Sequence, residues 1–599
     1  MVNKFDIGSE LLDLENQNND TADSPLDCYF LDKEGYLCRY RSTKHGPIPA
    51  RLANFQAFIK EEIIQDDGLE VKHSYAIEGK SCKGITLHRI EVSASQFNSM
   101  NWTYQWGNHA IIEPGQASKD FLRHAIQFCS NGIQQKTIFT HMGWRQINKE
   151  WVYLSNSGAI GADNICVRLP RGLQRYSLPQ VPENELGAIK ESLTFINIGN
   201  REITLPLFSL LYLAPLTTLL NPMPNFSGYL HGDTGTFKTT ILELALSHFG
   251  PFGQGNLANF DDTANALGKQ AFILKDTLSG LDDYFPSFRR VEAQQKEGLA
   301  QKIIRAYANR TGRSRLNPDA SDKGRYEPRG MLLITGEELP VNQSTLARLM
   351  VIEISRGDIS LQKLTEIQRN AHRLPSAMSS YIIWLKNQIN AIKHSFPEKF
   401  LKLREKAQQQ NVHKKLPEQV AFLQFALETA ISWMVDKKVL HEKCADALAK
   451  EGWNIFISLS AKQSTRIERE DPVRKFLEIA QTIITQGKVK LEHKDERNHE
   501  ILGQAMGDLI GYFDDAFLYL LPPAVWNSVM RFCSVEGSHF PISKNTFFRL
   551  LKNRGLIITT DNQTATPEWL RGRTRRVLKI YRSHIYEKEV MKVIGDEDA

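Results

Sequence analysis

The sequence predicts a multidomain α/β protein with an N-terminal α+β domain, a central P-loop domain followed by a helical segment, and a C-terminal winged helix. Three observations predict this class. The 599 residues are too many for one hydrophobic core. Between about 220 and 355, strands, loops and helices alternate as they do in a parallel sheet. The segment HGDTGTFKTT at 231–240 has the order of a phosphate-binding loop.

Pattern and composition divide the chain into five parts. From about 25 to 190, short alternating segments such as GYLCRYR and EWVYLSNSGAI indicate strands, and ANFQAFIKEEI and KDFLRHAIQFC are the clearest helices. The apolar run at 205–220 indicates a buried helix, and SAKQSTRIERED indicates a linker. The expected parts are a mobile acidic tail at 1–24, an N-terminal α+β domain at 25–190, the ATPase core at 191–360, a helical lid at 361–465 and a C-terminal region with the winged helix at 466–599.

The overall composition is that of a soluble globular protein, with 41% hydrophobic and 24% charged residues. No apolar run approaches the ~20 residues of a membrane span, and the start lacks the features of a secretory signal. The seven cysteines are scattered and include no CxxC pair, so we expect a reducing cytoplasm. Cys28 and Cys38 flank a turn and could meet across a hairpin; the alternative is that both are plain strand residues.

The phosphate loop follows a short apolar strand and opens a helix. Its backbone amides would surround the phosphates of ATP, Lys238 would reach the β- and γ-phosphates, and Thr239 would ligate Mg²⁺. Phe237 stands where the usual pattern has a second glycine, so either it excludes nucleotide or its side chain points away from it. The expected nucleotide-binding residues are Gly232, Asp233, Thr234, Gly235, Thr236, Phe237, Lys238, Thr239 and Thr240.

A motor also needs carboxylates at the end of a neighbouring strand. FILKDTLSGLDDYFP offers Asp276 and the pair Asp282–Asp283. We favour the pair, with Asp282 towards the metal ion and Asp283 towards the attacking water. The next strand, RGMLLITGEELP, ends in Thr335, Glu337 and Glu338, and of these we favour Thr335 as the polar residue at the strand tip.

Arg348 follows in STLARLMVIEI, between a short helix and a new strand. An arginine there could project into the nucleotide of a neighbouring subunit and stabilise transition-state charge. The alternative is a surface arginine that caps a helix.

With these elements in order, the chain resembles the hexameric AAA+ replicative helicases of mobile genetic elements, the cassette-chromosome type, which are related to minichromosome maintenance helicases. The resemblance rests on GDTGTFKTT, FDDTANALGKQAFILKDTLSGLDDYFPS and PRGMLLITGEELPVNQSTLARLMVIEI, and covers roughly 40–360. Minichromosome maintenance loops also lack the glycine before the lysine. The resemblance supports Asp282–Asp283 as Walker B acids, Thr335 as sensor 1 and Arg348 as the trans arginine finger.

The resemblance further implies a homo-hexameric ring with single-stranded or forked DNA at its centre, an N-terminal collar, and other replication proteins of the same element as possible partners. The helicases that this chain resembles carry a β-hairpin before sensor 1, and that hairpin lines the channel. Here residues 301–330 hold eight Lys or Arg against three carboxylates, a local net charge of +5, whereas the whole chain carries only +6. Arg313, Arg315 and Lys323 are therefore candidates for phosphate contacts; the alternative is a solvated basic loop.

The C-terminal outline is a helix, KNTFFRLLKNR, capped by Ser543 and ended by Gly555, followed by the strands LIITT and RRVLKIYR. This winged-helix pattern suits DNA or a protein contact.

For the whole chain we expect an ATP-dependent DNA helicase or translocase. The rival hypotheses are a nucleotide-switched DNA-binding regulator without unwinding activity, and a ring component that does not hydrolyse ATP. Arg369 and Arg373 both qualify as the sensor-2 arginine.

Overall fold

The computed structural model describes residues 29–586, apart from the segments 254–256, 286–288, 313–314, 317–321, 341, 411, 496, 505, 537–539 and 560–562. The tail expected at 1–24 lies outside the described residues. The chain forms two compact units. The first runs to Thr140 and includes Ile165–Arg168, and the second holds His141–Asn164 and the chain from Leu169 onwards.

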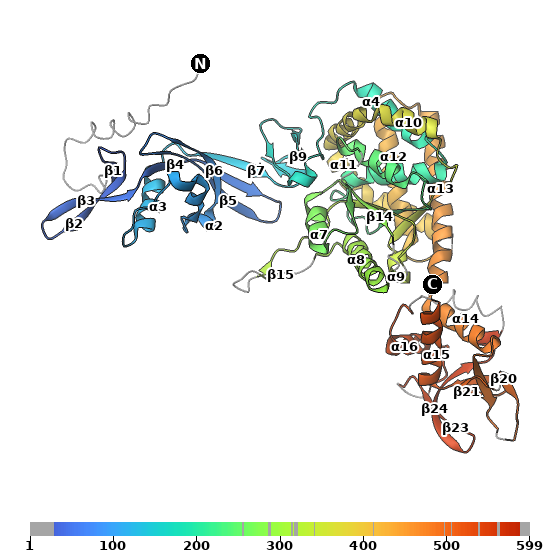
Figure 1. Cartoon of the computed structure of the whole chain (residues 1–599). Helices are drawn as coiled ribbons and strands as arrows, with labels where there is room; N and C mark the ends of the chain where they lie inside the picture. The colour runs from blue at the N-terminus through green and yellow to red at the C-terminus, as the bar shows by residue number, and fades with distance from the viewer. Residues whose placement is uncertain are drawn as a thin grey trace. The chain divides into compact units, whose positions relative to one another are not determined.

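The first unit is built on a five-stranded sheet with the strand order β11-β7-β4-β5-β6 and on a three-stranded antiparallel sheet, β1-β2-β3. Helix α3 packs on β3 and β4 (Figure 1). Its elements are β1 (Tyr29–Leu31), β2 (Leu37–Thr43), β3 (Gly46–Ala53), β4 (Phe55–Asp66), β5 (Val71–Ser81), β6 (Thr86–Ser93), α2 (Ala94–Phe97), η2 (Asn101–His109), α3 (Ser118–Phe128), β7 (Gln134–Phe139) and β11 (Cys166–Val167). The expected turn after β1 is present, whereas Cys28 lies outside the described residues.

The segment ANFQAFIKEEI is a strand, so its prediction as a helix is wrong. Strand β4 pairs antiparallel with β5 and parallel with β7. Phe55, Ala57 and Ile59 alternate along it as buried residues of the core, which is the period of two of a strand. Good helix formers in this stretch are overridden because both neighbouring strands supply backbone partners.

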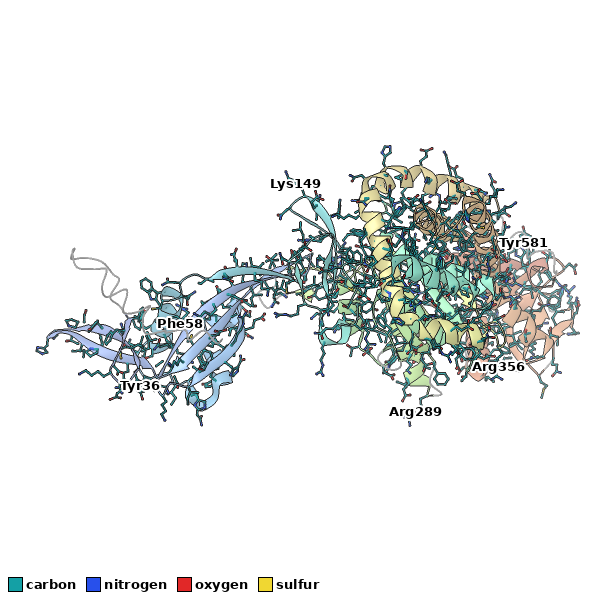
Figure 2. The ribbon with its side chains drawn as sticks, turned by 90° about the horizontal axis from the view of Figure 1, so that it is seen from above. Tyr36, Phe58, Lys149, Arg289, Arg356 and Tyr581 are labelled. Atoms are coloured by element: carbon teal, nitrogen blue, oxygen red, sulfur yellow. The ribbon has the colours of Figure 1, made fainter. Side chains whose placement is uncertain are left out.

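The second unit begins earlier than the boundary expected near 190. Residues 143–160 form an antiparallel hairpin sheet of β8 (Gly143–Ile147), β9 (Glu150–Ser155) and β10 (Gly158–Ile160), and Figure 2 labels Lys149 in its first turn. Trp144 donates from its indole Nε1 to Pro215 O at 2.7 Å, and the Tyr153 hydroxyl donates to Asp276 O at 2.7 Å. These buried contacts tie the hairpin to the central sheet.

The central sheet has five parallel strands in the order β13-β14-β17-β12-β18. The apolar run at 205–220 is the buried helix α5 with the turn η5, as predicted. The elements are α4 (Glu185–Thr194), α5 (Arg201–Leu213), η5 (Ala214–Leu216), β12 (Ser227–His231), α6 (Lys238–Leu246), η6 (Ser247–Phe249), β13 (Ala258–Asn259), α7 (Ala264–Ile273), β14 (Leu278–Tyr284), α8 (Arg290–Asn309), β15 (Arg315–Leu316), β16 (Asp322–Lys323), β17 (Met331–Gly336), α9 (Gln343–Leu346) and β18 (Leu349–Glu353).

The stretch predicted to be helical is α10 (Leu361–Arg369), η7 (Ala371–Arg373), α11 (Leu374–Gln408), α12 (Leu416–Asp436) and α13 (Glu442–Arg469). The segment expected as a linker, SAKQSTRIERED, is mostly the last turns of α13, so the boundary expected at 466 falls inside this helix. The break comes at Asp471, whose carboxylate accepts from Val473 N and Arg474 N at the start of the next helix. No helix in the described ranges is long and apolar enough to cross a membrane.

The C-terminal region is a six-stranded mixed sheet, β20-β19-β21-β22-β24-β23, covered by helices. The helix expected after Ser543 forms. Of the expected strand LIITT the structure describes Leu556–Thr559, where Ile558 forms an isolated bridge to Lys579 and no strand is present. The hairpin partner of β24 is instead β23. The elements are α14 (Pro472–Thr485), β19 (Val489–His493), β20 (Ile501–Gly503), β21 (Asp508–Phe513), β22 (Phe517–Leu520), α15 (Pro522–Val535), α16 (Lys544–Asn553), β23 (Thr566–Leu570), β24 (Arg573–Tyr581) and α17 (Ser583–Tyr586).

Candidate nucleotide site

The phosphate-loop segment lies at the carboxyl edge of the central sheet. Strand β12 ends at His231, the loop covers 232–237, and α6 begins at Lys238. Within the loop, the Thr236 hydroxyl and the Lys238 ammonium both donate to Asp233 O at 2.7 Å. The strand, loop and helix therefore follow the predicted order, and the amino end of α6 opens onto the loop as an anion-binding helix end does.

Phe237 takes the backbone conformation that a glycine would supply. Its φ is +68°, in the left-handed region, at the residue that precedes α6. Gly235 in the same loop also has a positive φ of +83°. The Phe237 side chain is 38% exposed. The loop thus keeps the turn that a second glycine gives while the phenyl ring stays partly in solvent.

The two adjacent acids lie opposite Thr335 because β14 carries a bulge. Leu281 pairs with Ile334 and Tyr284 with Gly336, so Asp282 and Asp283 together face one residue of β17. The Thr335 hydroxyl donates to the Asp282 carboxylate and accepts from Asp283 N at 3.0 Å. Asp283 has a φ of +61°, which aspartate tolerates better than most residues.

The phosphate loop and the acid strand meet through Thr239. Its hydroxyl donates to the Asp282 carboxylate oxygens at 3.0 and 3.1 Å. A hydroxyl beside a carboxylate is an all-oxygen donor pair of the kind that Mg²⁺ accepts, together with phosphate oxygens and water. The residues present therefore fit a magnesium nucleotide.

Negative charge accumulates at this edge. Burial, and then the charges of Asp282 and Glu337, raises the pKa of Asp283. Burial, followed by the charge of Asp282, also raises the pKa of Glu243. A cation bound beside these carboxylates would stabilise their charged forms.

Glu243 and Glu337 also belong to this site. Glu243 is not among the residues predicted from the sequence, and Glu337 is an alternative to Thr335 at the strand tip. Glu243 follows Thr239 by four residues on α6, so the helical period puts both on one face. Glu337 follows the tip of β17, and the Thr234 hydroxyl of the loop donates to its carboxylate. The sequence contains a signal for both residues: Glu243 lies one helical turn after Thr239, and Glu337 lies two residues after Thr335.

Asp276, the alternative acid, occupies a different place. It precedes β14, at the opposite edge of the sheet, and is fully buried. Its carboxylate accepts from Thr218 N at 2.8 Å, from Trp144 N at 3.0 Å and from the Lys275 ammonium at 2.5 Å. These partners make Asp276 a structural anion that joins the β8–β10 hairpin to the core.

Arg348 precedes β18, so it lies at the amino edge of the sheet, away from the phosphate loop of its own chain. Its guanidinium donates to Ser344 Oγ at 2.6 Å and to Asn309 Oδ1 at 3.4 Å. Burial, and then the charge of Arg305, lowers the pKa of Arg348. The position fits an arginine that acts outside its own subunit, and the contact with Ser344 is also that of the alternative, a helix-capping arginine.

The arginines of the helical segment differ in their surroundings. Arg369 and Arg373, at the ends of α10 and η7, are both exposed. Arg466 on α13, which the sequence reasoning did not single out, pairs with Glu353 at the carboxyl end of β18. Glu353 is the register partner of His231, the last residue before the phosphate loop. Arg466 is thus a third candidate for contact with nucleotide.

The basic segment before β17 forms a hairpin, as predicted. Arg315 and Lys323 are register partners on β15 and β16, whereas Arg313 lies outside the described residues. The base of the hairpin is closed by Arg310, whose guanidinium donates to Pro224 O at 3.0 Å and to Gly330 O at 2.7 Å. The hairpin is thereby fixed to the segment that leads into β12.

Comparisons with known proteins identify the class of fold. A solved structure of the active helicase Cch of SCCmec type IV is similar over 96% of this chain and 99% of that chain, with a TM-score of 0.56 and 12% sequence identity. A structure of the C-terminal region of NrS-1 matches 70% of this chain and 90% of that chain, with a TM-score of 0.26 and 9% identity. No family model and no curated protein matches the sequence.

The likeness to the Cch structure extends over nearly the whole of both chains, and at 12% identity it shows a common fold. This chain therefore has the multidomain mixed α/β fold of a solved helicase, with a parallel sheet at its centre.

Proposed function

We propose that this chain is an ATP-dependent DNA helicase or translocase that works as a ring oligomer in the replication of a mobile element. One observation carries the proposal. The Thr239 hydroxyl of the phosphate loop, the Asp282 carboxylate and the Thr335 hydroxyl are joined by hydrogen bonds at the carboxyl edge of a parallel sheet. Ligands bind at this edge of open α/β sheets.

Each residue of the constellation has a distinct part. The amides of 232–237 and the amino end of α6 bind phosphate oxygens, and Lys238 moves from Asp233 O to the β- and γ-phosphates. Thr239 and Asp282 hold Mg²⁺, which neutralises the phosphate charge when the nucleotide is bound. Asp283 polarises the attacking water, since its raised pKa makes it a better proton acceptor than an ordinary aspartate. Thr335 holds both acids in place, because its hydroxyl donates to the Asp282 carboxylate and accepts from Asp283 N.

The sheet also supports the ring. Arg348 lies at the amino edge, so it completes a site only when a second subunit presents its carboxyl edge to it. Such a head-to-tail contact is heterologous and closes into a ring when the rotation allows. The resemblance to the helicases of mobile elements implies AAA+ architecture, a homo-hexamer and replication proteins as partners, and we include these in the proposal. Arg315 and Lys323 on the hairpin would grip the DNA backbone.

The first test is Lys238→Ala, with the exposed Lys363→Ala on α10 as the matched control. We expect DNA-stimulated ATP hydrolysis and strand separation to fall at least about 100-fold in Lys238→Ala, because the charge facing the phosphates is lost, and to be unchanged in Lys363→Ala. Full activity in Lys238→Ala would overturn the site. ATP binding with no strand separation and little stimulation of hydrolysis by single strands would instead support the nucleotide-switched regulator.

Arg348 can be tested by mixing two inactive variants. In an equal mixture of Lys238→Ala and Arg348→Ala subunits, some interfaces combine an intact Lys238 with an intact Arg348 from the neighbour. Random assembly makes about a quarter of the interfaces intact, so we expect about a quarter of the wild-type hydrolysis. An arginine that acts within its own subunit would give no recovery.

A further inference from the structure

The β23–β24 hairpin of the C-terminal region carries an exposed aromatic face. Opposite residues of an antiparallel pair lie on the same face, and Trp569 pairs with Thr574 while Pro567 pairs with Arg576. All four side chains are exposed, and Trp569 is 70% exposed. We call these four residues the hairpin face; it belongs to the red-orange strands β23 and β24 in Figure 1.

The other face of the hairpin is packed. Leu570 and Val577 join Tyr512 and Tyr519 in a small buried cluster. The Arg575 guanidinium lies 5.3 Å from the centre of the Tyr512 ring. The hairpin could therefore have placed an apolar residue inwards at little cost, yet its one tryptophan is on the outside.

The hairpin is also held rigidly. Its two-residue turn, Arg571–Gly572, has φ values of +45° and +73°, the geometry of a type I′ turn. The Arg571 side chain donates to Glu492 Oε2 at 2.6 Å and to His493 O at 3.1 Å on β19. A platform that is ordered before binding loses little conformational entropy when it binds.

The cation on this face is available. Within the described part of the chain Arg576 makes no ion pair, whereas its neighbours Lys579 and Arg571 are paired with Glu568 and Glu492. Arg576 is diagonal to Trp569 in the register, within reach of the same ligand. A flat aromatic ring beside an unpaired guanidinium matches a base next to its phosphate.

A protein strand is a poorer ligand for this surface. Strand β23 is the edge of the sheet, and Pro567 removes one of the N–H groups that an added strand would need. We therefore propose that the hairpin face binds single-stranded nucleic acid, with Trp569 stacking on an unpaired base and Arg576 contacting the adjacent phosphate. The inference rests on the proposed function and adds a strand-binding site outside the ATPase core.

The test uses the full chain without nucleotide and a thymidine 20-mer, with a blunt duplex of the same length beside it. We expect Trp569→Ala to weaken binding of the single strand about tenfold, within the about 5- to 150-fold range of one stacked base, and Trp569→Phe to retain most of it. Arg576→Ala should lower the slope of log affinity against log salt by about 0.7. Val535→Ala, another exposed apolar residue of this region, is the matched control and should bind as the unaltered protein does.

A second readout locates the contact. With 4-thiothymidine in the strand, the photocrosslink should fall in the peptide that contains Trp569 and be lost in Trp569→Ala. If Trp569→Ala weakened binding of the single strand and of the duplex equally, the inference would be overturned. It would also be overturned if the substitution changed only the oligomeric state, since the hairpin face would then be a protein contact. Lys238→Ala, tested beside it for ATP hydrolysis, reports on the proposed function independently.

Discussion

The two candidate acids, Asp276 and Asp282, should respond oppositely to the same substitution. In Asp276→Asn the amide keeps one oxygen, which can still accept from Thr218 N. The new NH₂ group then faces donors on the other side, Trp144 N at 3.0 Å and the Lys275 ammonium at 2.5 Å. The Lys275 ammonium would lose the carboxylate that it pairs with. Because its side chain is only 15% exposed, water could not replace that partner. Breaking a buried pair in this way costs about 3–5 kcal/mol.

Asp282→Asn removes one negative charge from a group of neighbouring carboxylates. It weakens the hydrogen bonds from Thr239 and Thr335 but relieves the repulsion that helps to raise the pKa of Asp283 and of Glu243. Because the two effects oppose each other, we expect the free energy of unfolding to change by no more than about 1 kcal/mol, while ATP hydrolysis is lost.

The assay is thermal unfolding of both variants, with ATP hydrolysis measured at a temperature where each is folded. The second unit has 24 + 431 residues, and at about 2.1 cal/mol/K per residue a loss of about 3–5 kcal/mol lowers its melting temperature by roughly 3–5 °C. Asp276→Asn should therefore melt measurably below the unaltered protein and Asp282→Asn within about 1 °C of it. Equal melting temperatures for the two variants, or an Asp276→Asn protein that is fully stable yet inactive, would refute the assignment.

Three further predictions concern the same core. Phe237→Gly should relieve about 1 kcal/mol of left-handed strain and preserve ATP binding in a nucleotide titration, whereas Gly235→Ala should weaken it; a lost affinity in Phe237→Gly would contradict this. In Arg310→Lys the single ammonium cannot keep both hydrogen bonds of the guanidinium, to Pro224 O and Gly330 O, so the hairpin is held less firmly. We expect this variant to unwind fewer base pairs for each ATP hydrolysed, measured by unwinding and hydrolysis assays on the same sample. An unchanged ratio would contradict the role of Arg310. Burial lowers the pKa of His248 from 6.5 to about 4, so the unfolded chain binds the proton first, and up to about 3 kcal/mol of stability present above pH 6.5 is lost as the pH falls towards 4. The dependence of melting temperature on pH across that range should flatten in His248→Gln.

The parts that the sequence predicted correctly are those decided by neighbouring residues. The strand, loop and helix around 227–246 and the hairpin strands that hold Arg315 and Lys323 follow from short-range patterns. The buried helix α5 and the turn η5, at 201–216, follow from an apolar run with polar residues at its start. Local patterns suffice here because each element carries its own turn or cap chemistry.

The errors come from partners far along the chain. Strand β4 contains good helix formers, and it is a strand because it pairs with β5, which follows it directly, and with β7, more than seventy residues later. The hairpin at 143–160 belongs to the second unit because Trp144 and Tyr153 find their partners at Asp276. The same long-range contacts decide that Asp276 is structural, a choice that the spacing of the acids had left open.

The bulge in β14 resolves a difficulty in the sequence argument for Asp282–Asp283. Adjacent residues of a regular strand point to opposite faces, so a pair of acids at a strand end would normally present one carboxylate to each side. Here one extra residue in β14 and the left-handed backbone of Asp283 let both acids lie opposite Thr335. The arrangement concentrates like charge and backbone strain at one point, and neither contributes to the stability of the empty site. In the proposed site, a bound magnesium nucleotide offsets that charge, so the local irregularity of the sheet is what makes two neighbouring acids usable together.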